Sequence, residues 1–354
     1  MARLRKVDSS GPGIRRRRRG KGFEYLDDDA KRVTEPSVLE RIRELAIPPA
    51  WEDVWICPYP MGHIQATGTD AAGRKQYRYH DKWRERRDAE KFEEMIDFAL
   101  ALPRMRERVD EDIRRKGMPR EKVLAVAMRL LDRGFFRIGS ENYAEENDTY
   151  GIATMGKRHV TVSNDQVTFD YEAKGGKRRV QSIGDPELAE IARVLKKRRG
   201  GGEELLAYKD GRRWVDVKSA DINAYLKEVT GGDFSAKDFR TWSGTVLAAV
   251  ALAVAGMAST SKSSRTRAKS RAVKEVSRYL GNTPAVCRAS YIDPRVFDRF
   301  DGGLTIGGAL PDLVEDTGPW PEVQRAVEQA VIDLIADNRE SDLVEKGVEL
   351  AEVA

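Results

Sequence analysis

The chain of 354 residues contains little cysteine: Cys57 and Cys287 are its two cysteines, and they lie far apart. Two distant cysteines are too few for a disulfide framework or a zinc site, and they indicate a reducing, intracellular compartment. We expect no metal and no other cofactor. The acidic run Asp27–Asp29 is more typical of an exposed surface than of a metal site.

Long apolar runs are also missing. No apolar segment near the N-terminus resembles a secretion signal. The most apolar stretch, Trp242–Met257, is shorter than the ~20 residues that cross a bilayer, and it predicts a buried core helix without membrane contact. The glycines at Gly200–Gly202 are not followed by the Gly-Lys-Ser/Thr of a phosphate-binding loop, so they indicate an ordinary loop.

The formal net charge is +5, and it is spread unevenly. Arg15–Arg19 form an unbroken basic run, whereas the C-terminal tail is rich in aspartate and glutamate. Without that tail, the body of the chain is more basic than the total suggests. A basic body points to nucleic acid as a partner, although a solvated basic face is the common alternative.

Composition and apolar spacing divide the chain into four segments: a basic, disordered arm at 1–22, a small β-rich domain at 23–88, a mainly helical domain at 89–310 and an acidic helical tail at 311–354. Apolar residues of the tail recur at helical spacing, at Val323, Val327, Val331 and Leu334. The tail could dock on the body, imitate the charge of DNA or bind a partner, and docking is the simplest interpretation.

The small domain is expected to contain a helix that begins near Thr34 and three strands, at 51–57, 63–67 and 74–80. In the last strand, Tyr77 and Tyr79 fall on one face, with cations between and beside them. This pattern fits either a strand that lies against DNA or a sheet edge with an aromatic pair.

The mainly helical domain is expected to open with helices between Lys82 and Gly139, broken at Pro103 and at Gly117–Pro119. A three-stranded antiparallel meander follows, at 158–163, 166–171 and 177–183. Later helices are expected at 185–199, 218–229, 237–257 and 271–280. The stretch 259–270, rich in Ser, Lys and Arg, is interpreted as a mobile basic loop.

Five side chains from four separate segments of the sequence form the candidate site. They are Arg137 at a helix end, Lys174 at a hairpin tip, Arg240 near the positive end of a helix dipole, and Asn282 and Tyr291 in the loop after a helix that Gly281 ends. Singly, each has an ordinary explanation: Arg137 could pair with a nearby glutamate, and Lys174 could be solvated. Together they suit a tyrosine that attacks a phosphodiester, because arginine forks match phosphate oxygens and a lysine can protonate a departing alkoxide.

The motifs FFRIG, EAKGGK, KDFRTW and LGN…SYIDP, which carry these five residues in order, resemble those of the type IB DNA topoisomerases. The likeness is to the compact poxvirus-like and bacterial branch and runs from about Phe23 to Ile306. GRKQYRY resembles the DNA-contacting strand of that branch, and ENDTYGIATM after Arg137 is also similar to it. Each motif alone is weakly specific, whereas the ordered set is strongly specific.

The resemblance implies an α+β fold, in which a small β-rich N-terminal domain and a mainly α-helical catalytic domain with a three-stranded antiparallel sheet form a C-shaped DNA clamp. It implies an enzyme that relaxes supercoils of both signs without ATP or an obligatory metal. We expect a monomer in the cytoplasm, associated with the nucleoid, with double-stranded DNA as its partner.

The resemblance also implies a role for each site residue. Tyr291 would be the nucleophile that forms a 3′-phosphotyrosyl link. Arg137 and Arg240 would hold the scissile phosphate, and Lys174 would protonate the 5′-oxygen. Further DNA contacts are expected from Arg74, Gln76, Tyr77, Tyr79 and Tyr143.

Some positions depart from the family pattern. Asn282 stands where many members have histidine, and an amide can donate to a phosphate oxygen but carries no charge. Ser140 and Asn142 stand where the viral branch tends to have lysines, so the sequence preference of the viral enzymes is expected to be relaxed here.

Two other classes of protein stay open. A tyrosine recombinase shares this chemistry and a related fold, and a DNA-binding protein without catalysis would share the basic body. Recombinases usually carry His-x-x-Arg where this chain has Lys237-Asp-Phe-Arg240. That difference favours the topoisomerase.

Overall fold

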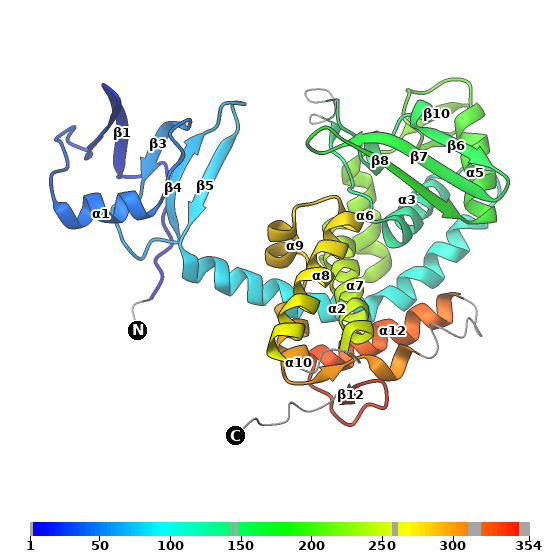
Figure 1. Ribbon diagram of the computed structural model, residues 1–354. Helices are drawn as coiled ribbons and strands as arrows, with labels where there is room; N and C mark the ends of the chain where they lie inside the picture. The colour runs from blue at the N-terminus through cyan, green and yellow to red at the C-terminus, as the bar shows by residue number, and fades with distance from the viewer. Residues whose placement is uncertain (1–2, 142–143, 145–147, 257–260, 311–319, 347–354) are drawn as a thin grey trace. The chain divides into compact units, whose positions relative to one another are not determined.

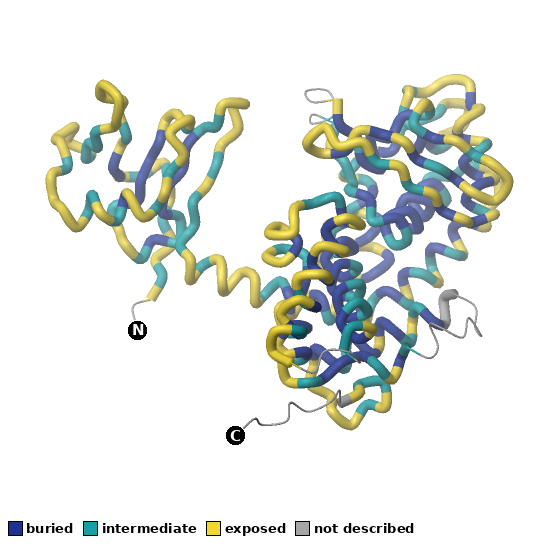
Figure 2. The backbone as a smooth tube through the Cα atoms, viewed as in Figure 1, coloured by how far each residue is buried: buried dark blue, intermediate teal, exposed yellow. Residues whose placement is uncertain are grey.

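The computed structural model describes residues 3–141, 144, 148–256, 261–310 and 320–346. The chain divides into two compact units, Met1–Glu93 and Glu94–Ala354 (Figure 1). Each unit has its own buried interior (Figure 2). Helix α2 (Asp81–Ile113) crosses the boundary, so the predicted division after residue 88 and the observed one both fall within this helix.

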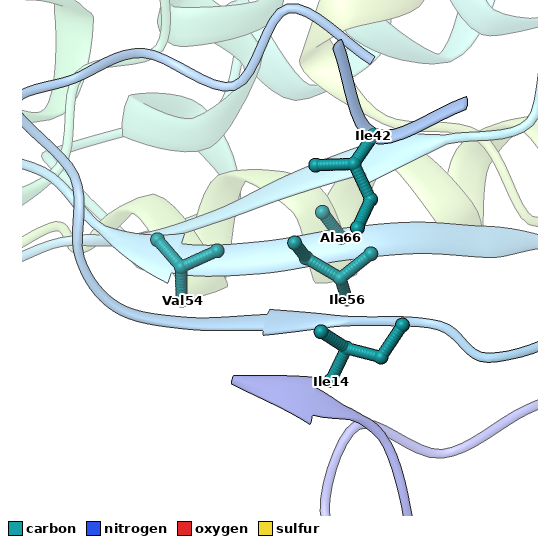
Figure 3. Packing of buried hydrophobic residues seen from close by; sticks show 5 residues of the cluster. All are labelled: Ile14, Ile42, Val54, Ile56 and Ala66. Carbon is teal, nitrogen blue, oxygen red and sulfur yellow. The ribbon is translucent and has the colours of Figure 1, made fainter. Parts of the chain in front are cut away.

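Unit 1 is built on a five-stranded antiparallel sheet with strand order β2-β1-β3-β4-β5. Its elements are β1 (Ile14–Arg19), β2 (Gly22–Leu26), α1 (Pro36–Glu44), β3 (Glu52–Ile56), β4 (Ile64–Thr69) and β5 (Lys75–Tyr79). Ile42 of α1 meets buried apolar side chains of three strands on one sheet face (Figure 3): Ile14, Val54, Ile56 and Ala66. The predicted helix and the three predicted strands of this region are confirmed.

The prediction of a disordered arm at 1–22 was wrong. The arginine run is strand β1, which pairs with β2 on one side and with β3 on the other. Ile14 anchors the start of the strand in the core, and Arg16 Nη2 donates to the carbonyl oxygens of Pro48 and Trp51 at 3.1 and 2.6 Å. Backbone pairing and the hydrogen bonds from Arg16 to carbonyl oxygens order this strand. Neither interaction requires apolar residues at regular spacing, so the apolar pattern of the sequence does not reveal the strand.

Unit 2 is mainly helical and carries the predicted three-stranded sheet. Its helices after α2 are α3 (Arg120–Gly134), α5 (Pro186–Lys197), α6 (Ser219–Thr230), α7 (Ala236–Gly256), α8 (Lys262–Leu280), α9 (Pro284–Ser290), α10 (Pro294–Asp301) and α12 (Trp320–Ile335), with 3-10 turns η1 (Ile152–Thr154), η2 (Lys157–His159) and η3 (Gly307–Ala309). The sheet strands β6 (Val160–Ser163), β7 (Gln166–Ala173) and β8 (Lys177–Gly184) pair in sequence order. Two small strand pairs were not predicted: β9 (Ala207–Asp210) with β10 (Arg213–Asp216), and β11 (Leu304–Thr305) with β12 (Glu345–Lys346).

Helix α7 is the core helix of unit 2. Among the described helices, it alone is long and apolar enough to suit a membrane span. It nevertheless packs against α3, α6, α8, α10 and α12, and 56% of its most apolar window is buried inside the protein. The predicted core helix is thereby confirmed.

Helix α2 continues through Pro103, where the sequence predicted a break. Leu102 and Met105 beside the proline are almost completely buried. Burying two such side chains contributes ~1.5–3 kcal/mol each, which equals or exceeds the ~3 kcal/mol that an internal proline costs. The second predicted break is confirmed, since α3 begins directly after Pro119.

The stretch 259–270 is not a loop over its described length, because α8 begins at Lys262; the first residues of the stretch lie outside the described part of the chain. Ala268 and Ala272 are buried on the inner face of this helix, and Arg265 Nη1 donates to a backbone carbonyl of α10 at 2.6 Å. Small residues and a buried arginine thus form the inner face of α8. The polar composition of the stretch gives no apolar pattern from which this face could be predicted.

The acidic tail docks on unit 2 through α12, which packs against α7 and α10. Its repeated apolar residues are all buried: Val323, Val327, Val331 and Leu334. Arg106 of α2 joins this helix to α3, because it pairs with Glu328 at 2.7 Å and with Asp132 at 2.9 Å. Docking, the simplest of the three interpretations, is confirmed for residues 320–335.

We expect Arg106→Ala to lower the free energy of unfolding by about 3–5 kcal/mol. The change leaves the carboxylates of Glu328 and Asp132, which are 11% and 10% exposed, without their cation. Denaturant unfolding followed by circular dichroism measures the loss, with Arg104→Ala at an exposed position of α2 as the control. Equal midpoints for the two variants would show that this cluster does not hold α12.

Candidate active site

One cavity of unit 2 gathers most of the predicted site. Its volume is ≈ 330 Å³, and its lining includes Arg137, Lys174, Arg240 and Tyr291. The fifth predicted residue, Asn282, accepts hydrogen bonds from both arginines. The five side chains come from the segment after α3, the β7–β8 turn, the start of α7 and the two flanks of α9.

Arg240 is the buried centre of the site, with 3% of its surface exposed. Its Nη1 donates to the carbonyl oxygen of Phe135 at 2.6 Å, and its Nη2 donates to that of Leu280 at 2.8 Å. Its buried Nε has no hydrogen-bond partner among the described residues. Burial, followed by the positive charge of Arg137, lowers the pKa of Arg240 to about 10. The site therefore holds excess positive charge and an unsatisfied donor, which together favour an anion.

The backbone at Arg137 is fixed by a close crossing of two chain segments. The Arg137 carbonyl oxygen accepts from the Ile152 N–H at 2.9 Å. Gly139, at φ +79°, lies against Gly151, and a Cβ on either residue would collide with the other. This crossing positions the guanidinium, whose Nη2 donates to Asn282 Oδ1.

One atom of Asn282 accepts hydrogen bonds from both arginines. Its Oδ1 accepts from Arg137 and, at 3.4 Å, from Arg240. Because the carbonyl end of the amide faces the arginines, the NH₂ end is the one left to donate to another acceptor. Glu141, a possible partner for Arg137, instead accepts from the N–H and hydroxyl of Ser219 at 2.9 and 3.0 Å.

Lys174 stands at the tip of the β7–β8 hairpin. Ala173 and Lys177 form the last pair of the two strands, and Gly175 and Gly176 turn the chain at φ +83° and +68°. Backbone angles of this kind favour glycine. The exposed lysine side chain thus extends from a base that the sheet holds in place, and it lines the cavity.

Tyr291 is placed by α9, a short helix where the sequence predicted a loop. Its N–H donates to the Cys287 carbonyl oxygen at 2.9 Å, and its ring centroid lies 5.2 Å from the guanidinium carbon of Arg240. The Tyr291 carbonyl oxygen lies against Gly244 of α7, where a Cβ would collide with it. Glycine at 244 therefore allows this tyrosine's backbone to approach the core helix.

Two further residues of the cavity were not predicted. Thr149 lines it with a buried Oγ1 that has no partner among the described residues. The Tyr150 hydroxyl accepts from Arg158 Nη2 at 2.6 Å and donates to Asp148, and this second bond, with burial, raises the pKa of Tyr150. Both residues lie in ENDTYGIATM, so the family resemblance of that segment was the available signal.

The predicted DNA-contacting strand is β5 of unit 1. Tyr77 and Tyr79 stack on one face of it, with ring centroids 5.9 Å apart, as the alternation predicted. Arg74 and Gln76 both donate to Asp70 Oδ2, at 3.0 and 2.9 Å. Hydrogen bonds, first among them that from Arg74, lower the pKa of Asp70 to about 2. Asp70 was not foreseen as a competitor for these two donors.

The roles predicted for the individual site residues stay untested, as do the DNA contact of Tyr143 and the absence of a metal. Tyr143 lies outside the described residues. Within the residues that the structure describes, no group of three or more His, Cys, Asp or Glu side chains could hold a metal ion. The expectation that the enzyme needs no metal remains a prediction.

Two family models match the chain: the catalytic core of eukaryotic DNA topoisomerase I over residues 80–300, and the N-terminal domain of bacterial DNA topoisomerase IB over residues 22–70. DNA topoisomerase 1B of Acanthamoeba polyphaga mimivirus is 32% identical over 287 residues, which cover 79% of this chain and 85% of the viral protein. DNA topoisomerase I of monkeypox virus is 26% identical over 107 residues, covering 30% of this chain and 34% of that protein. DNA topoisomerase 1 of Daucus carota is 26% identical over 129 residues, covering 36% of this chain and 15% of that protein.

The class that the fold, the cavity and these matches define is that of the DNA topoisomerases, isomerases that bind DNA. The chain belongs to the type IB family of these enzymes. Of the three classes that the sequence left open, this is the one that the matches support. The residues of the cavity lie within the matched catalytic core, whereas the strand β5 lies between the two matched regions.

We expect inorganic phosphate to raise the thermal midpoint of unfolding at constant ionic strength, because it brings negative charge to Arg137 and Arg240. At ten times its dissociation constant, a ligand of the folded state adds about 1.4 kcal/mol. Scanning fluorimetry with sodium chloride as the reference salt measures the shift. Arg137→Ala should lose it, and Arg267→Ala, at an exposed position of α8, should keep it. An equal shift in Arg137→Ala would mean that phosphate binds elsewhere.

Proposed function

We propose that this type IB topoisomerase relaxes positively and negatively supercoiled DNA by cutting one strand, allowing controlled rotation and sealing the strand again, without ATP or an obligatory metal. The observation that carries the proposal is the convergence of Arg137, Lys174, Arg240 and Tyr291 on one cavity. The intermediate is a 3′-phosphotyrosyl link. Because that link keeps the energy of the phosphodiester bond, resealing needs no external energy source.

The phenolic oxygen of Tyr291 attacks the scissile phosphorus, and its proton passes to water. The guanidinium carbon of Arg240, 5.2 Å from the centroid of the Tyr291 ring, brings positive charge beside the reacting residue. As the new bond forms, the bond from phosphorus to the 5′-oxygen breaks.

Arg137 and Arg240 donate to the non-bridging oxygens as charge gathers there. Arg137 also contributes to the lowered pKa of Arg240, so the two guanidiniums repel each other before the substrate is bound. The bound phosphodiester relieves part of that repulsion with its single negative charge, and the transition state, which gathers more charge on the non-bridging oxygens, relieves more of it. The interaction is therefore stronger in the transition state than in the ground state, which is the condition for catalysis.

Asn282 donates its amide N–H to the same phosphate. Unlike the histidine that many family members carry, an amide does not titrate between pH 5 and 8. The contact that Asn282 supplies is therefore independent of pH in that range.

Lys174 protonates the 5′-oxygen as it leaves and takes the proton back when the strand is sealed. An alkoxide is a poor leaving group, so a proton donor has its largest effect at this position. The glycine turn that carries Lys174 supports this role, because the flexible side chain extends from a fixed hairpin.

We propose further that the two units form a C-shaped clamp on duplex DNA and that one copy of the chain suffices. DNA contacts come from Arg74, Gln76, Tyr77, Tyr79 and Tyr143. The enzyme then works where its DNA lies, in the cytoplasm at the nucleoid, without membrane contact. The basic body of the chain supports this arrangement, and affinity is expected to fall steeply with salt.

The substitution Tyr291→Phe is expected to abolish relaxation and the covalent adduct while leaving the affinity for duplex DNA unchanged, because only the nucleophilic oxygen is removed. Plasmid relaxation in EDTA without ATP, adduct formation on gels and anisotropy measure the three properties. Tyr279→Phe, at an exposed tyrosine of α8, is the matched control and should stay active. Relaxation by Tyr291→Phe would remove this residue from the mechanism.

Lys174→Ala is expected to slow single-turnover cleavage by roughly 100-fold or more, the usual effect of losing a general acid. A substrate with sulfur in place of the bridging 5′-oxygen should restore the rate, because a thiolate leaves without a proton. Lys177→Ala, in the same hairpin, controls for loss of charge. If the sulfur substrate is cleaved as slowly as the normal one, the lysine does not act as the acid.

A further inference from the structure

On the face of the unit 1 sheet that points away from α1, residues from two distant parts of the sequence lie in one row. Directly opposed residues of antiparallel strands point to the same side of a sheet. One such row crosses β1, β3, β4 and β5: Arg15, Trp55, Thr67 and Tyr77. The neighbouring row points to the other side, into the core under α1 (Figure 3): Ile14, Ile56 and Ala66.

Arg15 therefore shares a face with Tyr77. Side chains alternate along a strand, so Arg17 and Arg19 point the same way as Arg15. The side chains of Arg17 and Arg19 are 65% and 61% exposed, and Glu24 of β2 pairs with Arg17 at 2.6 Å. We call the β1–β2 hairpin the arginine ribbon. On this face it carries three guanidiniums and one carboxylate, so it has an excess of positive charge.

The middle of this face is covered by the chain that precedes β1. Trp55 Nε1 donates to the Gly11 carbonyl oxygen at 3.2 Å, and Lys75 Nζ of β5 bonds Ser9 Oγ at 3.3 Å. The accessible parts are therefore the two sides, β5 and the arginine ribbon. The sheet order places β1 three strand spacings from β5, which is about 14 Å, the rise of about four base pairs.

We propose that the arginine ribbon is a second contact of unit 1 with the phosphate backbone of duplex DNA, about four base pairs from the contact made by β5. A two-stranded ribbon fits the width of the major groove, and arginine forks match phosphate oxygens. This inference rests on the proposed function, because the DNA contact of β5 is part of that proposal.

A merely solvated basic strand is the competing interpretation. The register speaks against it, because three of the four exposed arginines of β1 (Arg15, Arg17 and Arg19) occupy the side of the sheet that also carries Tyr77 and Tyr79, while Arg18 is exposed on the other side. Arg16, which points to the other side, donates instead to the carbonyl oxygens of Pro48 and Trp51. The three arginines that point toward the tyrosine side thus have exposed guanidiniums that can meet a phosphate, although Arg17 and Arg19 also pair with Glu24.

The test uses the full chain with Tyr291→Phe, so that binding is measured without cleavage. Anisotropy gives the affinity for a long blunt duplex over a series of potassium chloride concentrations. Each lost phosphate contact lowers the slope of log affinity against log salt by about 0.9, so Arg15→Gln with Arg19→Gln should lower it by about 1.8. Arg15→Lys with Arg19→Lys should keep most of the slope. Arg19→Gln alone, near the tip of the hairpin, should lower it by about 0.9 and serves if the double variant does not fold.

The control carries Arg212→Gln with Arg213→Gln, which removes the same charge from the exposed β9–β10 hairpin of unit 2. Its slope is expected to equal that of the parent. An equal fall of the slope in the ribbon double variant and in this control would show that only net charge matters, and it would overturn the proposal. An unchanged slope in the ribbon variants would also overturn it.

The proposed function is tested separately, in the chain with Tyr291 intact. Loss of adduct formation there would overturn that function, while a lower slope in the ribbon variants would still support the second DNA contact. Normal adduct formation with unchanged slopes would overturn the ribbon contact alone.

Discussion

Two hydrogen bonds from the buried guanidinium of Arg240 to backbone carbonyls hold the active site together. One acceptor is Phe135, which ends α3, and the other is Leu280, the last residue of α8. Both lie at helix C-termini, where the helix dipole favours a cation. The guanidinium on α7 thus aligns the segment that carries Arg137 with the segment that carries Asn282 and Tyr291.

The type of acceptor matters as much as its position. Some arginines elsewhere in unit 2 pair with carboxylates, as the partly buried Arg106 does with Glu328 and the buried Arg129 does with Asp185. The buried Arg265, like Arg240, donates to a backbone carbonyl oxygen. In the site, the acceptors of Arg240 among the described residues are two carbonyl oxygens and an amide oxygen, which take hydrogen bonds from its two Nη atoms without neutralising its charge. A carboxylate there would compete with the substrate. The lowered pKa of Arg240 reflects the free energy that this arrangement costs the unbound protein.

The sequence predicted the elements whose periodicity arises from burial, namely the three-stranded sheet, the core helix α7 and the docked helix α12. It failed where order comes from polar contacts with the backbone. Strand β1 is held by pairing and by the carbonyl acceptors of Arg16, and α8 conceals its inner face behind serines and a buried arginine. Neither kind of contact changes the apolar pattern on which such predictions depend.

The same limit applies to the site. Chemical type and motif order identified Arg137, Lys174, Arg240, Asn282 and Tyr291, and the structure brings these five together. The carbonyl acceptors of Arg240 and the competing carboxylate of Asp70 were not predicted, because contacts between residues distant in sequence depend on the three-dimensional fold. Thr149 and Tyr150 were included only within a longer segment similar to the family.

The contact between Gly244 and the carbonyl oxygen of Tyr291 means that a position outside the cavity affects a residue that lines it. Gly244 has no reactive group and is not among the residues that line the cavity, yet its lack of a side chain lets the backbone of Tyr291 lie against the core helix. A larger residue at 244 would displace Tyr291 by steric collision alone. The core helix is thereby tied to the cavity at a position that has no reactive group.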